Sequence, residues 1–183
     1  FRSFSPITTG DYSVSFISLG SAFGDRIKDK NSTFFNAFMA NREVISRRLG
    51  MQNPNSVGAT TGGFADGYDK NSQDVLVASF IAAYTGKDVE KVRLNSMPKI
   101  PLPNWRLNYS GFNKWVFISD RFDDFIISHG YRSTYSVNGF NSIVRYAEQN
   151  GFSNVRDDNN NFLPLYQFSQ VTISEQLSPL IGV

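Results

Sequence analysis

Alternation of apolar and polar residues is clearest between Phe125 and Val137, in the sequence FIISHGYRSTYSV. Odd-numbered positions in this stretch are mostly apolar or aromatic, and even-numbered positions are mostly small and polar, with Arg132 as the one charge. Strand side chains alternate between two faces, so the pattern predicts a strand with one apolar and one polar face. A soluble sandwich or an outer-membrane barrel could use such a strand. Its length of about 13 residues favours the barrel, because globular strands average about 5–6.

The same alternation predicts further strands. They are expected near 104–111, 125–137, 140–146 and 163–177, with another strand segment in 1–31. Asn138 and Gly139 both accept positive φ, so this pair predicts a two-residue hairpin that leads into the strand 140–146. Near Gly20 the alternation of the first segment slips, which predicts a β-bulge.

A first helix is predicted near 33–49, where apolar residues recur at steps of three and four. Ser32 or Thr33 is expected to cap its start, because a hydroxyl can accept a bond from an orphaned backbone N–H. Gly50 is expected to end it.

A second helix is predicted near 73–85, with Ser72 as its cap and Gly86 as its end. Apolar residues cover most of its circumference, which is typical of a helix buried among other elements. Between the helices, GATTGGFADG lacks the Lys-Ser or Lys-Thr ending of a phosphate-binding loop and is expected to be a flexible connection.

These elements predict three segments. A β-strand segment of barrel wall occupies 1–31, a helical and loop insertion occupies 32–103, and antiparallel transmembrane strands occupy 104–183. The fold class is therefore expected to be mainly β with a small helical insertion.

Composition narrows the classes of function. The chain has no cysteine, which excludes disulfides, thiolate catalysis and cysteine-ligated metals. Its net charge of +2 is weak and gives no sign of a nucleic-acid surface. Aromatic residues make up 15% while mean hydropathy is −0.29, a combination that suits strands with one polar face. No run reaches the roughly 18–20 apolar residues of a membrane-spanning helix, so membrane insertion would use strands.

The two ends of the sequence suggest a segment of something larger. It begins with Phe1 rather than Met, and we expect a processed chain, a recombinant piece or a fragment. It ends at Val183 without a terminal turn or cap, and we expect a further strand beyond it.

Candidate catalytic groups are few along this chain. His129 is the single histidine, and it lies on the apolar face of its predicted strand, where a packing role is expected. Asp123 and Asp124 are adjacent, so on a strand they would point to opposite faces and could not act as a carboxylate pair. No group of nucleophile, base and oxyanion donor is present, so we expect no enzyme, no catalytic residue and no cofactor.

One stretch has part of the pattern of a calcium loop. Asp157, Asn159 and Asn161 imitate its first three ligands. Phe162 stands where the loop needs glycine, and Phe168 stands where it needs a bidentate Glu. We therefore expect a solvated turn and no metal.

Five blocks of sequence, in one order, carry a resemblance to a known family. They are FNAFMANREVISRRLG, SQDVLVASFIAAYTGKD, PKIPLPNWRLNYSG, SHGYRSTYSV and NVRDDNNNFLPLYQFSQVTISEQLSPLIGV. Together they resemble the C-terminal part of the SprA (Sov) family, the outer-membrane translocon of the type IX secretion system, which is linked to gliding motility in some bacteria. The similarity runs from about Ser32 to Val183.

The resemblance implies a fold and a set of partners. Family members form a single-chain barrel of about 36 strands in the outer membrane of Gram-negative bacteria, and secreted proteins with a C-terminal sorting domain pass through its lumen. This chain would supply a few strands of the wall. Its partners would be the remainder of the barrel chain, a PorV-like barrel, a periplasmic plug protein, cargo and outer-membrane lipid. The family has no known catalytic residues to transfer to this chain.

Two hypotheses follow. In a barrel wall, the polar face would line the lumen, with Arg106, Asn108, Ser110, Ser128, Arg132, Thr134, Ser136, Gln170, Thr172, Ser174 and Gln176. The apolar face would meet lipid, with Trp105, Leu107, Tyr109, Phe125, Ile127, Tyr131 and Tyr135. The alternative is a soluble β-rich binding module, for example for carbohydrate, with Trp105, Tyr131 and Tyr135 as stacking platforms.

Overall fold

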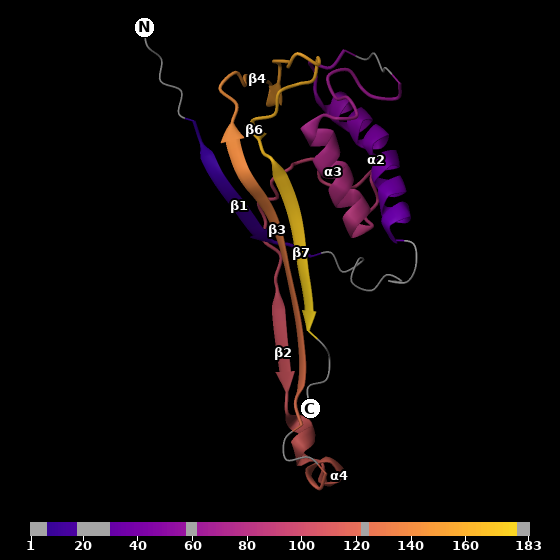
Figure 1. Cartoon of the computed structure of the whole chain (residues 1–183), viewed down its shortest axis with the longest axis vertical. Helices are drawn as coiled ribbons and strands as arrows, with labels where there is room; N and C mark the ends of the chain where they lie inside the picture. The colour runs from indigo at the N-terminus through magenta and orange to yellow at the C-terminus, as the bar shows by residue number, and fades with distance from the viewer. Residues whose placement is uncertain (1–6, 18–29, 58–61, 122–124, 179–183) are drawn as a thin grey trace. The chain divides into compact units, whose positions relative to one another are not determined.

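The computed structural model describes residues 7–17, 30–57, 62–121 and 125–178 (Figure 1). These residues divide into two compact units, each treated by itself below. We call one the helical unit and the other the strand unit. The helical unit comprises the described parts of 1–12, 18–98 and 137–171, and the strand unit comprises the described parts of 13–17, 99–136 and 172–183.

Helices and antiparallel strands are combined in this chain. In chain order the described elements are β1 (Thr9–Ser15), α2 (Lys30–Gln52), α3 (Gln73–Thr85), β2 (Trp105–Tyr109), the 3₁₀ helix η1 (Gly111–Lys114), α4 (Val116–Ser119), β3 (Ile127–Ser142), β4 (Glu148–Gln149), β5 (Phe152–Ser153), β6 (Tyr166–Gln167) and β7 (Gln170–Ser178). β3 is the central strand of a five-stranded sheet and pairs with β1, β2, β6 and β7, while β4 and β5 form a separate pair.

In the helical unit, α2 and α3 pack against each other, which confirms the two predicted helices (Figure 1). Ile45 of α2 is fully buried, and Phe34 and Phe80 meet edge to face across the helix pair. α3 is buried along most of its length, as its apolar circumference predicted. Gly86 ends it with a φ of 63°, a left-handed conformation that glycine adopts at little cost.

The predicted helix boundaries were partly wrong. α2 begins at Lys30, so neither Ser32 nor Thr33 occupies its cap position. Ser72 does stand at the N-cap of α3, but its side chain makes no capping bond; its carbonyl accepts the bond from Leu76 N instead. The start of α3 therefore depends on packing rather than on a hydroxyl cap.

Gly50 lies inside α2, which continues to Gln52, so the prediction that it ends the helix was wrong. A Cβ at this position would come within 2.5 Å of the Ala65 Cβ. The glycine therefore allows the helix and the following loop to approach closely, and this packing outweighs its poor helix propensity.

The connection after α2 packs onto the loop after β5. The Asp66 carboxylate accepts two hydrogen bonds from the Arg156 guanidinium, of 2.8 and 2.6 Å. Gly67 lies directly against the Phe162 ring, and its φ of 79° is in the left-handed region. Phe162 forms a small core with Tyr68 and Val75. The described part of the glycine-rich segment is thus irregular, as expected, but held in place by its neighbours.

The hairpin predicted at Asn138-Gly139 was wrong, because β3 runs through both residues to Ser142. Gly139 does adopt positive φ, 62°, as in β-bulges that place a glycine in the left-handed region. Its N–H donates to the Asp11 carboxylate, and Ser142 N donates to the Thr8 carbonyl. Pairing with the N-terminal segment therefore keeps the chain extended.

A second Asn-Gly pair forms the turn instead. Asn150 and Gly151 have φ values of 56° and 80°, as a two-residue type I′ turn requires, and they join β4 to β5. The predicted strand 163–177 is divided into β6 and β7. The β-bulge predicted near Gly20 lies outside the described residues.

No helix among the described residues has both the length and the apolar character that a bilayer-crossing helix needs.

Candidate functional site

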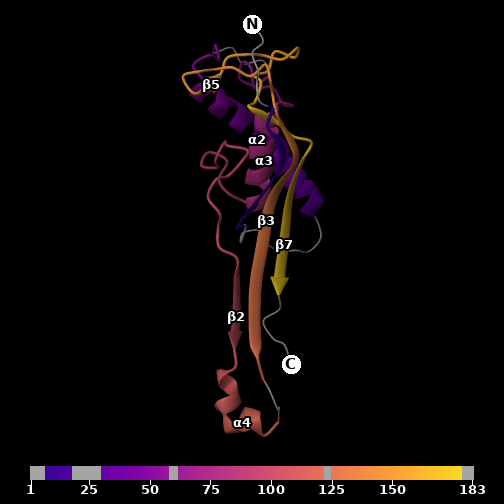
Figure 2. The same ribbon diagram turned by 90° about the vertical axis from the view of Figure 1, so that its left-hand side faces the viewer.

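Three strands of the strand unit carry the candidate site. β2 and the first part of β3 are antiparallel, with direct pairs from Trp105 opposite Tyr131 to Tyr109 opposite Ile127. β7 pairs with β3 on the side away from β2 (Figure 2). We call residues 105–109, 127–136 and 172–178 the ladder. Its two faces follow the alternation read in the sequence.

The first face of the ladder, which we call the aromatic face, is built around one cross-strand pair. The rings of Trp105 and Tyr131 are stacked with centroids 4.7 Å apart. His129, opposite Leu107, has its ring 6.3 Å from that of Trp105. The structure therefore places the single histidine among apolar and aromatic neighbours.

Glu175 also lies on the aromatic face, and sequence analysis missed it. Along β7 it follows Val171 and Ile173 at steps of two, and all three are half-buried. The Tyr131 hydroxyl donates a 2.7 Å hydrogen bond to Glu175 Oε1. A carboxylate at an apolar position of the alternation was the signal that Glu175 needs a polar partner, but it does not identify that partner.

The exposed fractions of the side chains on the aromatic face correct part of the list of residues expected to meet lipid. Tyr131 is 1% exposed and Tyr135 is 0% exposed, so this chain itself covers both side chains. The ring of Phe16 contributes to the cover, 5.9 Å from that of Tyr135. By contrast every residue of β2 is exposed, including Leu107 at 61%. The expectation of outward-facing side chains therefore holds for β2 and fails for Tyr131 and Tyr135.

The opposite face, which we call the polar face, contains an open groove of about 700 Å³. Gly130 forms its floor: it is opposite Arg106, and a Cβ built on it would lie 3.4 Å from the Ser178 hydroxyl of β7. Arg132 also lines the groove. The remaining lining residues are Asn104, Trp105, Ser128, His129, Tyr131 and Gln176. Sequence analysis identified the arginines but not the space between them.

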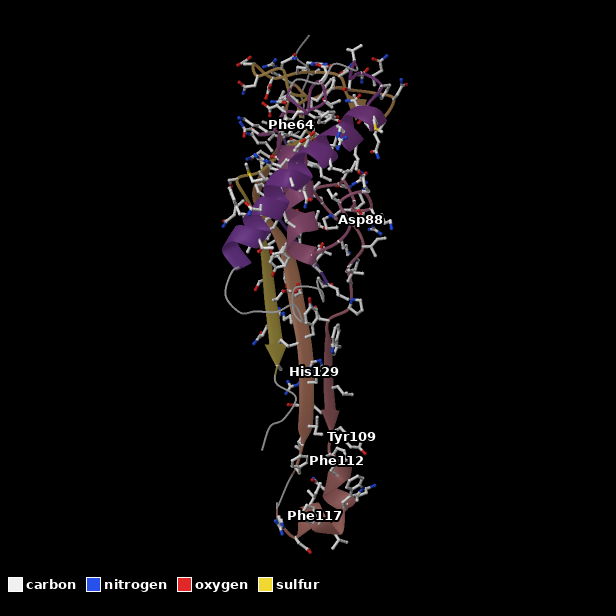
Figure 3. The ribbon with its side chains drawn as sticks, turned by 90° about the vertical axis from the view of Figure 1, so that its right-hand side faces the viewer. Phe64, Asp88, Tyr109, Phe112, Phe117 and His129 are labelled. Carbon is white, nitrogen blue, oxygen red and sulfur yellow. The ribbon has the colours of Figure 1, made fainter. Side chains whose placement is uncertain are left out.

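Aromatic side chains gather where β2 turns into β3 (Figure 3). Phe112 of η1 lies edge to face with Tyr109 and Trp115, at centroid distances of 5.1 and 5.0 Å. Phe117 of α4 is 71% exposed, and the Arg121 guanidinium lies 4.9 Å from its ring centroid. This turn therefore presents large apolar surface with a cation beside it.

The stretch that has part of the calcium-loop pattern is a hydrogen-bonded turn. Asp157 Oδ1 accepts bonds from the backbone N–H groups of Asn159 and Asn161, and the Asn161 side-chain oxygen accepts from Asp69 N. Backbone donors thus occupy Asp157 Oδ1 and the Asn161 side-chain oxygen. Within the described ranges no group of three or more His, Asp or Glu residues could hold a metal ion. Asp123 and Asp124 lie outside those ranges.

Two carboxyl groups of the helical unit have shifted pKa values. The hydrogen bond from Arg156 lowers the pKa of Asp66 to about 2. Burial raises the pKa of Asp74 to about 6, although the Ser96 hydroxyl donates to it over 3.3 Å and opposes the rise. The first belongs to a structural ion pair, and the second is a half-buried acid in the first turn of α3.

Comparison of the sequence with protein-family models and with curated proteins finds no match.

Proposed function

We propose that this chain forms part of the wall of an outer-membrane protein-conducting pore of the type IX secretion kind, linked to gliding motility. In this role it moves folded cargo proteins and makes or breaks no covalent bond. The five ordered sequence blocks support the proposal. One structural observation supports it most directly: Trp105, Leu107 and Tyr109 of β2 are all exposed on one face, while Arg106 and Asn108 are exposed on the other.

An apolar strand face exposed in this way needs a covering layer. Soluble antiparallel sheets usually bury one face against a core, whereas a barrel wall turns that face to lipid and the other to water. The exposed aromatic turn supports the same role, since Trp and Tyr concentrate at membrane interfaces. We infer that Trp105, Leu107 and Tyr109 contact lipid.

The strand edges suggest the first partner. Among the described strands β2 pairs only with β3, and so does β7. Open edges cannot be satisfied in hydrocarbon, so a wall segment would pair with further strands of the barrel. The other proposed partners are a PorV-like barrel, a periplasmic plug protein and cargo with a C-terminal sorting domain. The barrel would have about 36 strands and lie in the outer membrane.

The alternative function, a soluble β-rich binding module, for example for carbohydrate, gains no support from the aromatic face. Stacking platforms must be accessible, but Tyr131 and Tyr135 are buried, and Trp105 already stacks on Tyr131. Two of its three expected platforms are therefore covered, and the third already has one ring face occupied.

Cysteine labelling tests the proposal, because the natural chain has no cysteine. A polarity-sensitive fluorophore is attached to Leu107→Cys or to the matched control Asn108→Cys, and the chain is folded into phosphatidylcholine vesicles. We expect spin-labelled lipid to quench the first label and aqueous iodide to quench the second. Equal iodide quenching of both labels, with the chain remaining outside the vesicles, would contradict the wall proposal and favour the soluble module.

A further inference from the structure

The groove on the polar face has the features of an anion site. Arg106 and Arg132 are both exposed there, and neither guanidinium forms an ion pair with a described residue. No Asp or Glu lies on the polar face of β2, β3 or β7 within the described residues. Two cations near each other without a carboxylate repel one another, and an anion between them would remove that repulsion.

The register places the two arginines beside Gly130, and both line the groove. Arg106 is directly opposite Gly130, and Arg132 is two residues further along β3 on the same face. They are therefore diagonal neighbours, with Cα atoms about 7–8 Å apart. Both side chains are long enough to reach across the strand pair, and Gly130 has no side chain to fill the space beneath them.

Neutral hydrogen-bond donors surround the same spot. The Ser128 and Ser178 hydroxyls line the groove. The Asn104 side-chain oxygen accepts a 2.9 Å bond from Ser133 N, so its NH₂ is the group left to donate. Arginines with hydroxyl and amide donors suit a tetrahedral oxyanion, because guanidinium binds phosphate through two parallel bonds.

We propose that the groove over Gly130 binds a phosphate group, held by Arg106 and Arg132. The inference goes beyond pore-wall function and depends only on the ladder, so its test is separate from the test for lipid contact. The phosphate is either a free ion or part of a lipid headgroup. The two sources share the same chemistry at the site.

Phosphorus NMR on the full chain tests the proposal, with inorganic phosphate as the probe at constant ionic strength. We expect saturable line broadening by the natural chain and at least about a tenfold loss of affinity in Arg106→Gln and in Arg132→Gln. Arg121→Gln is the matched control, because its guanidinium lies over Phe117 and away from the groove. Broadening that stays the same in both groove variants, or no saturable broadening in the natural chain, would overturn the proposal.

A second variant leaves both charges in place. Gly130→Val fills the floor of the groove, and the backbone tolerates it because Gly130 does not have positive φ. We expect it to abolish phosphate binding, while Thr134→Val on the same face, outside the groove, leaves binding unchanged. Circular dichroism verifies the strands in each variant. Unchanged binding by folded Gly130→Val would also overturn the site.

Vesicle sedimentation then identifies the source of the phosphate. Arginine-dependent binding to phosphatidylglycerol vesicles but not to phosphatidylcholine vesicles would assign a lipid headgroup. Arginine-dependent binding of inorganic phosphate alone would assign a free phosphate ion. Either result supports the groove, whereas vesicle binding that survives both arginine substitutions counts against it.

Discussion

Trp105 and Tyr131 are direct cross-strand partners, and their rings are stacked 4.7 Å apart. The pair joins an exposed strand to a buried position of β3, since Tyr131 is covered on its other side and bonded to Glu175. It therefore adds a side-chain contact to the backbone pairing that joins β2 to β3.

We predict that this stack has a measurable coupling energy. In a double-mutant cycle of Trp105→Leu and Tyr131→Leu, followed by denaturant unfolding, the coupling should be about 0.5–1.5 kcal/mol, as for other aromatic pairs. The control cycle uses Asn108→Ala and Ser128→Ala, direct partners on the polar face. A coupling there as large as that of the ring pair would show that the effect belongs to the strand pairing and not to the stack.

Gly67→Ala should destabilise the chain much more than Gly62→Ala. Both glycines have positive φ, so each substitution carries backbone strain of about 1 kcal/mol. Only Gly67 lies against the Phe162 ring, which adds an overlap cost of about 1–3 kcal/mol; at Gly62 a Cβ meets nothing within 4 Å. Thermal unfolding of both variants measures the difference. Equal losses would mean that Phe162 moves aside without cost.

Acid should weaken the contact between Asp66 and Arg156. The folded pKa of Asp66, about 2, lies below its ordinary value of 3.8, so the folded state holds the proton less tightly than the unfolded state does. Its stabilisation is complete above pH 4 and is lost as pH falls towards 2, amounting to about 1–2 kcal/mol. The natural chain should lose this amount relative to Asp66→Asn between pH 5 and pH 2. Parallel stability curves for the two chains over that range would refute the expectation.

Asp74 should give the free energy of unfolding the opposite dependence on pH. Its folded pKa of about 6 lies above the ordinary 3.8, so the folded state binds the proton more tightly. Its contribution to stability is most favourable below pH 3.8 and declines as pH rises through 6. Asp74→Asn should therefore raise the free energy of unfolding at pH 7.5 by about 1–3 kcal/mol and remove this pH dependence. Urea unfolding at pH 4 and pH 7.5 measures the free energy of unfolding of both chains. A variant less stable than the natural chain at pH 7.5 would contradict the prediction.

Strand faces and helix positions could be predicted because they follow from local periodicity. The alternation through β2 and the start of β3 gave the two faces that the register confirms, and apolar spacing located α2 and α3. The bond between Tyr131 and Glu175 could not be found in this way, because it joins residues 44 positions apart. The groove over Gly130 likewise exists only once β2, β3 and β7 are aligned.

The two Asn-Gly pairs show where local signals stop being sufficient. Asn150-Gly151 forms the I′ turn that such a pair favours, while Asn138-Gly139 does not, although both offer the same backbone freedom. Bonds from Gly139 to Asp11 and from Ser142 to Thr8 decide the second case, and both reach more than a hundred residues back along the chain. Gly50 is a second case in which a tertiary contact overrides a local signal, since its close approach to Ala65 outweighs its tendency to end a helix.

The left-handed glycine in β3 has a consequence for how the strand finds its partner. A slip of one residue between β1 and β3 would exchange the side chains on the two faces. Such a slip would also move Gly139 away from the Asp11 carboxylate and place a residue with a side chain at the kink. Gly139 therefore favours the correct register, because any shifted pairing of β1 with β3 would be less stable while the sheet is still forming.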